Sequence, residues 1–161
     1  MARSSMRRRG AAGLALAAVV LIGAGCGSSD EEDAPAACLA TGDAYRQALQ
    51  AAPGAVRLEG DVPISDCLTP SQGTGELENI GQEMIVTATR LNAEARRDPA
   101  GTAAVELGYL IGAVSKGADS AHTELVRRLT ASAQFSETGE TLPPEFQQAF
   151  GRGYTAGLQS G

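Results

Sequence analysis

The stretch AAVELGYLIGAV, residues 103–114, carries a single charged residue, Glu106, and otherwise consists of apolar residues, one tyrosine and two glycines. A helix that is apolar on nearly every side is buried, so this stretch predicts the central helix of a helical protein. We expect this helix to run to about Lys116, with Asp98 as its N-cap and Pro99 at its first position.

Small residues recur along this helix and form one face, made by Gly101, Val105, Gly108 and Gly112. A glycine inside a helix costs about 1 kcal/mol relative to alanine, so a compensating contact is expected. We interpret the face as a site of close approach by a neighbouring helix, as in small-xxx-small packing. Two alternatives stay open. The glycines leave a groove for an apolar ligand, or the run enters a membrane as a hairpin, being too short to span one.

The sequence before this stretch predicts two further helices. Residues 76–97 carry acidic residues early, arginines late and an apolar stripe at helical spacing, formed by Leu77, Ile80, Met84, Ala88, Leu91 and Ala95. A shorter helix is expected over residues 45–52, ended by Pro53-Gly54. Residues 55–73 are interpreted mainly as a long loop with room for a brief extended segment around Val56, Leu58 and Val62.

Two more helices are expected after Gly117, which suits the end of the central helix. The first is capped by Ser120 and runs to about residue 133. We expect His122 to be exposed in its first turn. Its side chains that face the core are Leu125, Val126 and Leu129. The last helix follows Pro143-Pro144 and carries a stripe of large apolar residues, namely Phe146, Phe150, Tyr154 and Leu158. This stripe either packs on the core or binds a partner protein. Its glycines at 151, 153 and 157 are expected to weaken it.

These elements predict an all-α fold over residues 38–161, an irregular and largely antiparallel bundle of four to five helices. The whole chain has 161 residues, which suffices for one small domain and little more. Few aromatic residues and many alanines give this domain a thin core.

The first 25 residues have the organisation of a signal peptide. Four arginines precede the apolar run of residues 11–24, which is shorter than the about 20 residues of a membrane-spanning helix. The run ends in LIGAGCGSS, residues 21–29, which resembles the lipobox of bacterial lipoproteins. The resemblance implies cleavage before Cys26 and a diacylglyceryl group on its sulfur. The alternatives are an uncleaved anchor, or a signal cleaved near Ala37 without lipidation.

The resemblance also implies a location. Two or more acyl chains, such as palmitate, hold a protein firmly to a bilayer. Lipid on Cys26 would therefore keep the chain on the outer face of the bacterial cytoplasmic membrane or elsewhere in the cell envelope. Residues 26–37 are expected to form an acidic, disordered tether. Without residues 1–25 the chain keeps 9 basic and 19 acidic residues, a net charge of −10, so an anionic membrane repels it.

Cys38 and Cys67 remain once Cys26 carries the lipid. An even pair of cysteines in an exported protein predicts a disulfide. The two residues lie too far apart in sequence for a CxxC redox motif. The bridge should contribute roughly 3.5 kcal/mol by restricting the unfolded chain.

The composition excludes several classes of function. One histidine and three scattered cysteines cannot build a His-rich or four-cysteine metal site. The acidic balance argues against nucleic acid as a partner. Neither a GxSxG nor an SxxK motif occurs, so we expect no enzyme and identify no catalytic, cofactor-binding or metal-binding residue. The acids of the tether would bind a cation only if a fixed backbone positioned them.

We therefore expect a membrane-anchored envelope lipoprotein whose helical domain is a non-enzymatic protein-interaction module for another envelope protein. The alternative is a carrier of a small apolar ligand or lipid in a glycine-lined groove of the central helix. Lipid that copurifies with the protein would favour the carrier, and a tightly packed core would favour the interaction module.

Cys26→Ser should abolish lipidation, because the diacylglyceryl group is attached to the cysteine sulfur. Metabolic labelling with a fatty-acid analogue measures this directly. The wild-type chain should carry the label and the variant should not. Equal labelling of both chains would exclude Cys26 as the attachment site.

Overall fold

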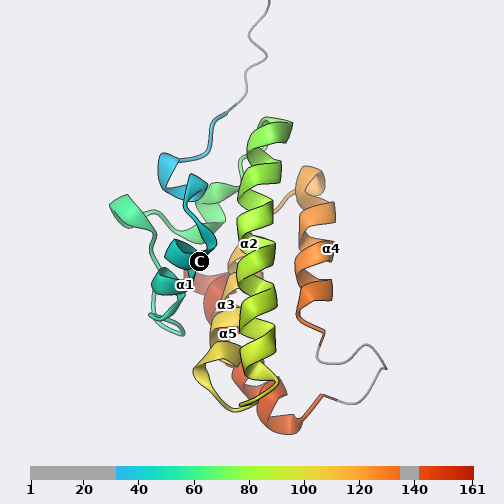
Figure 1. The fold of residues 1–161 in the computed structure, drawn as a ribbon. Coiled ribbons are helices and arrows are strands. Elements are labelled where there is room, and N and C mark those ends of the chain that lie inside the picture. The colour runs from blue at the N-terminus through green and yellow to red at the C-terminus, as the bar shows by residue number, and fades with distance from the viewer. Residues whose placement is uncertain (1–31, 135–141) are drawn as a thin grey trace, which may run out of the picture.

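The computed structural model describes residues 32–134 and 142–161 (Figure 1). Over these residues the fold is all-α, as the sequence predicts, with one isolated bridge between Leu58 and Val62 in place of any strand. The α-helices are α1 (Gly42–Leu49), α2 (Thr74–Ala95), α3 (Thr102–Gly117), α4 (Thr123–Ser132) and α5 (Pro144–Ser160). Four short 3₁₀ helices connect them: η1 (Ala36–Leu39), η2 (Glu59–Asp61), η3 (Ile64–Cys67) and η4 (Ser120–His122).

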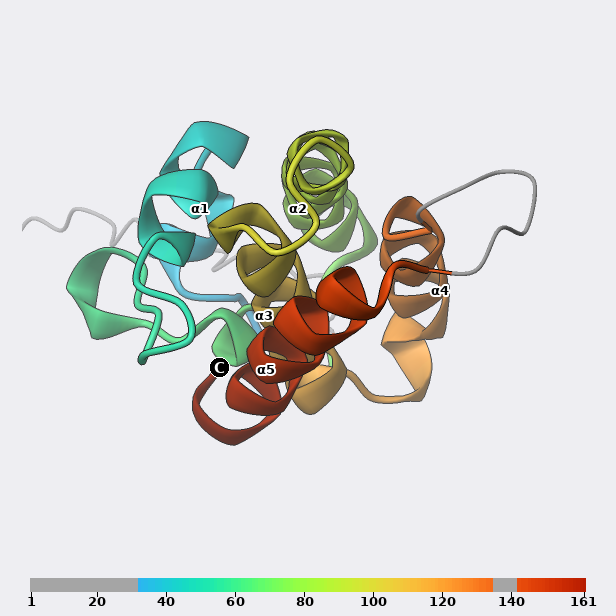
Figure 2. The ribbon, with the colours of Figure 1, turned by 90° about the horizontal axis from the view of Figure 1, so that it is seen from below.

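The central position of α3 is confirmed. Every residue from Ala104 to Val114 is buried, and α3 contacts each of the other four α-helices. Figure 2 shows α3 in the middle of the domain with α1, α2, α4 and α5 around it. The apolar stripe of α2 is confirmed too, since Ile80, Met84 and the residues that continue the stripe are buried, while Leu77 is half-buried.

The most extensive helix contact joins α3 to α5 through glycines on both helices. A Cβ atom on Gly108 or Gly112 would overlap backbone atoms of α5. A Cβ atom on Gly153 or Gly157 would overlap backbone atoms of α3. The small-residue face therefore serves close helix packing, except at Gly101, which precedes α3 and lies against Asp98 of its own turn.

The helices α2 to α5 alternate in direction along the chain, so α3 and α5 run parallel (Figure 1). The glycine contacts also show that α3 and α5 run parallel, because positions later in α3 face positions later in α5. Gly108 faces Phe150 and Tyr154, and Gly112, one turn later, faces Tyr154 and Leu158. The bundle is antiparallel between neighbours in sequence, whereas its closest pair of helices is parallel.

The buried face of α5 differs from the predicted stripe. Phe146 is buried, but Phe150 and Tyr154 are half-buried and Leu158 is 41% exposed. The buried face consists of Phe146, Ala149, Gly153 and Gly157. Small residues let the backbone of α5 reach α3, so α5 turns this face inward and the stacked rings of Phe150 and Tyr154 flank the contact. The glycines expected to weaken α5 include the two that dock it.

The predicted N-cap of α3 is wrong. Asp98 and Pro99 lie in a turn that the Gly101 N–H closes by donating to the carbonyl of Asp98 at 3.0 Å. α3 begins at Thr102, with Gly101 as its N-cap. The four residues 98–101 read Asp-Pro-Ala-Gly, which is the residue preference of a type I turn, and turn formation prevails over capping.

The start of α4 also differs from the expectation. The predicted helix opens with the 3₁₀ helix η4, whose N-cap is Asp119 and not Ser120, and α4 itself begins at Thr123 with His122 as its N-cap. The Asp119 side chain accepts a hydrogen bond from the Ala121 N–H at 2.8 Å. The Asp119 N–H donates to Nδ1 of His122 at 3.2 Å. His122 is 1% exposed, so its expected exposure is wrong. The hydrogen bond folds the imidazole back over the helix start, which buries the ring.

Packed structure begins before the expected boundary at residue 38. Ala34 is buried, and its N–H donates to Oε2 of Glu76 at 3.2 Å. The Thr69 hydroxyl donates to the carbonyl of Glu32 at 2.5 Å. Residues 32–37, assigned to the tether by sequence, therefore lie against the domain. The predicted signal peptide, Cys26 and the rest of the predicted tether lie outside the described residues.

Gly153→Ala should destabilise the domain by about 1–3 kcal/mol, because the added methyl group overlaps backbone atoms of α3 that cannot rotate away. Gly151→Ala is the matched control on the same helix. A Cβ atom at Gly151 meets nothing within 4 Å, so stability should rise by up to about 1 kcal/mol from helix propensity alone. Thermal unfolding compares the two variants, and equal melting temperatures would contradict the glycine contact.

Candidate functional site

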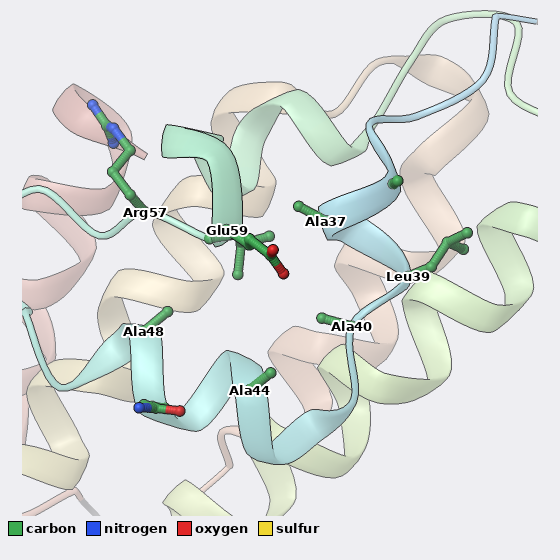
Figure 3. A pocket seen from close by; sticks show the side chains of 10 residues that line it. Ala37, Leu39, Ala40, Ala44, Ala48, Arg57 and Glu59 are labelled. Carbon is green, nitrogen blue, oxygen red and sulfur yellow. The ribbon is translucent and has the colours of Figure 1, made fainter.

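A hollow of about 550 Å³ lies where η1, α1 and the segment before η2 meet (Figure 3). Half of its ten lining residues are alanines, namely Ala36, Ala37, Ala40, Ala44 and Ala48. We call this hollow the alanine groove. Leu39 lines it as well and is 55% exposed, so an apolar side chain of full size stands at its edge.

The wall made by η1 is held by the disulfide. Cys38 and Cys67 are bonded and fully buried, which confirms the predicted pair and joins η1 to η3. The hydroxyl of Tyr45, on α1, donates to the carbonyl of Cys38 at 2.8 Å and lies 3.8 Å from the sulfur of Cys67. Burial, with a smaller contribution from the charge of Glu83, raises the pKa of the Tyr45 phenol. The phenol therefore stays a hydrogen-bond donor to η1 at neutral pH.

The wall made by α1 is fixed to α2. The Gly42 N–H donates to Oε2 of Glu83 at 2.6 Å, and a Cβ atom on Gly42 would lie 3.2 Å from the same oxygen. Two ion pairs continue the contact, Asp43 with Arg90 at 2.6 Å and Arg46 with Glu94 at 2.7 Å. With that side of α1 on α2, Ala44 and Ala48 line the alanine groove.

The third wall is the segment from Val56 to Val62. The Leu58 N–H donates to the carbonyl of Val62 at 2.8 Å, and Gly60 and Asp61 both adopt left-handed backbone angles, φ 73° and 64°. The turn needs glycine at position 60, and aspartate is among the residues that tolerate this conformation at 61. Figure 3 shows the Glu59 side chain pointing into the hollow from this turn.

Arg57 and Glu59 are the charged residues that line the groove. One guanidinium nitrogen of Arg57 donates to the carbonyls of Val56 and Ser160, both at 2.8 Å, and the side chain points away from the hollow (Figure 3). Glu59 is exposed and has no ion pair or hydrogen bond among the described residues. The groove therefore combines alanine methyl groups with the Gln47 side chain and one inward-facing carboxylate.

The sequence contains one signal for this groove. Ala36, Ala40, Ala44 and Ala48 are spaced by four residues. The spacing does not belong to one helix, since η1 ends at Leu39 and α1 begins at Gly42. Helical periodicity could not have placed these alanines around one hollow, because their common orientation arises from the packing of two separate segments.

Away from the groove, a buried acid lies on α3. Glu106 is 6% exposed, and burial raises the pKa of its carboxyl, while the nearby charge of Arg46 and a hydrogen bond with Thr102 oppose the shift. Arg46 is itself paired with Glu94. Glu106 thus lies close to Arg46 of α1, where that helix joins the bundle. No group of three or more potential metal ligands occurs among the residues described.

Comparisons with protein-family models, with curated proteins and with solved structures find no match to this chain. Among the helices of residues 32–134 and 142–161, none is both long and apolar enough to cross a membrane.

Glu106→Gln should stabilise the domain at pH 7, because a neutral amide avoids burying a charge. A raised folded-state pKa means that the folded chain holds this proton more tightly than the unfolded chain. The stabilisation from the protonated carboxyl is complete below the unfolded pKa, about 4.3, and is lost as pH rises through the folded pKa. The advantage of the variant should thus disappear at about pH 4 and below.

Denaturant unfolding of both chains at pH 4 and pH 7 measures the effect. Glu78→Gln is the control, since Glu78 is exposed on α2 and its replacement should change stability by less than about 0.5 kcal/mol at either pH. A Glu106→Gln variant that is less stable than wild type at pH 7 would show that the Glu106 charge stabilises the fold.

Proposed function

We propose that this chain is an envelope lipoprotein, anchored by lipid on Cys26, whose helical domain binds another envelope protein through the alanine groove. The anchor rests on the sequence, in which a basic segment, an apolar run and small residues precede Cys26. The binding function rests on one observation, an open hollow half of whose lining residues are alanines, with the exposed Leu39 at its edge.

An apolar surface concentrated in a hollow favours recognition of a partner. Isolated exposed apolar residues are ordinary, whereas an apolar patch shaped as a groove is typical of a binding site. The disulfide and the Tyr45 hydrogen bond hold the η1 wall in place. A preformed wall lowers the entropy lost when a partner binds.

The position of the groove along the chain suits a partner near the membrane. Ala36 follows Cys26 by ten residues. Even a fully extended chain of that length spans at most about 35 Å. A lipid on Cys26 would therefore keep the groove within reach of proteins at the membrane surface. Other acids of the domain, such as Glu32 and Asp33, are exposed and favour a protein partner over the anionic lipid surface.

The carrier alternative depended on a groove along the glycines of α3. Those glycines face backbone atoms of α5, so they do not support a ligand cavity. The alanine groove has the size of a small-molecule site, but it is open and holds a carboxylate, which favours a protein surface over a lipid tail.

Photo-crosslinking in the native envelope tests the proposed function. A photo-reactive amino acid placed at Leu39 or Ala44 of the full chain should give one covalent adduct of the same mass from both positions. Ala131 is the control position, because it is exposed on α4, away from the groove. Identical products from all three positions, or no adduct from Leu39 and Ala44, would reject the groove as a binding site.

A further inference from the structure

We infer that the alanine groove receives a lysine or arginine side chain of the partner protein, with its methylene stem on the alanines and its charged head on Glu59. The inference rests on the proposed function of the groove and adds the chemistry of the group that fills it.

The lining of the groove suits a methylene stem. Its walls are methyl groups of half-buried or exposed alanines, among them Ala37, Ala40, Ala44 and Ala48. The short side chains on η1 and α1 leave the alanine groove open, so that a chain of methylene groups can enter it. Lysine and arginine commonly pack their stems on apolar surface in this way while the charged head stays in contact with water.

The charge inside the groove selects a cation. Glu59 points into the hollow and has no cationic partner among the residues described (Figure 3). Arg57 does not neutralise it, because the Arg57 guanidinium donates to two carbonyls on the far side and lies 3.7 Å from Asp61. Asp61, which is outside the groove lining, is thus the acidic neighbour of Arg57, and Glu59 is the carboxylate that lines the groove.

The alternatives to a basic side chain are disfavoured by desolvation and repulsion. A purely apolar side chain would cover the Glu59 carboxylate and remove its water without supplying a donor, which is unfavourable. An acidic side chain would be repelled. A lysine or arginine head satisfies the carboxylate, and the bridge between Leu58 and Val62 holds the turn that presents it. An exposed ion pair adds little affinity, so its main effect is on selectivity.

Three labelled peptides test the inference with the full chain in phospholipid nanodiscs, by fluorescence anisotropy. The peptides share the blocked sequence Ala-Leu-X-Leu-Ala, with lysine, norleucine or glutamate at X. The lysine peptide should bind about 2- to 5-fold more tightly than the norleucine peptide, the ratio that one exposed ion pair supplies. The glutamate peptide should bind most weakly.

Variants of the chain assign the preference to the groove. Glu59→Gln should bring the affinities for the lysine and norleucine peptides to the same value. Ala44→Leu should weaken the binding of all three peptides, because the larger side chain fills the alanine groove. The controls are Glu145→Gln and Ala131→Leu, both at exposed positions outside the groove. They should leave every affinity unchanged. Thermal unfolding checks that each variant is folded.

Equal binding of the three peptides, no binding of any, or a lysine preference that survives Glu59→Gln would overturn the inference. The crosslinking and peptide experiments together distinguish failure of the proposed function from failure of this inference. If Leu39 still gives a specific adduct in the envelope and Glu59→Gln does not reduce it, the groove binds a partner without using this carboxylate. If the peptides behave as expected but no adduct forms, the basic-side-chain chemistry holds and the envelope partner is rejected.

Discussion

The backbone contact between α3 and α5 is the interaction on which the rest of the structure depends. Gly108 and Gly112 on one helix and Gly153 and Gly157 on the other leave no room for a side chain between them. The chain has no tryptophan and six phenylalanine and tyrosine residues in total, so large side chains are scarce. Close backbone packing supplies dispersion contacts in their place, which offset the cost of glycine in a helix.

The alanine groove depends on this contact through hydrogen bonds at the end of α5. The Tyr109 hydroxyl, on α3, accepts from the Val56 N–H at 3.1 Å and lies 3.1 Å from the hydroxyl of Ser160. Arg57 donates to the carbonyl of Ser160. The segment that carries Glu59 is thus tied to both helices of the glycine contact. A change in how α5 docks would move the third wall of the groove.

The long helices and the short helices of the domain are held in place by different sets of interactions. Helices α2 to α5 form a bundle held by apolar packing, whereas η1, α1, η2 and η3 are short and lie together on one side (Figure 1). Short helices are marginal on their own. Here the Cys38–Cys67 disulfide, the Tyr45 hydrogen bond and two ion pairs to α2 hold them in place. The groove is built among these short helices, where these bonds add to the apolar packing of Tyr45, Leu49 and Ile64 in the common core.

The class of fold, the central place of α3, the buried stripe of α2 and the pairing of Cys38 with Cys67 are all predictable from the amino-acid sequence. These features follow from apolar periodicity and from the small number of cysteines, which are local properties of the chain. The sequence also marked Gly108 and Gly112 as a contact face, because glycine inside an apolar helix needs a compensating neighbour.

Only the tertiary structure decided which helix fills that face, how α5 is rotated and where the groove lies. From the sequence, Gly153 and Gly157 are expected only to destabilise α5, because glycine has a low helix propensity. In the structure they also let the backbone of α5 contact the backbone of α3. Phe150 and Tyr154 follow a helical stripe, yet the backbone contact turns them to the flank. His122 is buried with a hydrogen bond to the preceding Asp119. Ala40 and Ala44 line one hollow from two separate segments. Each of these outcomes is set by a neighbour in space, which local periodicity does not specify.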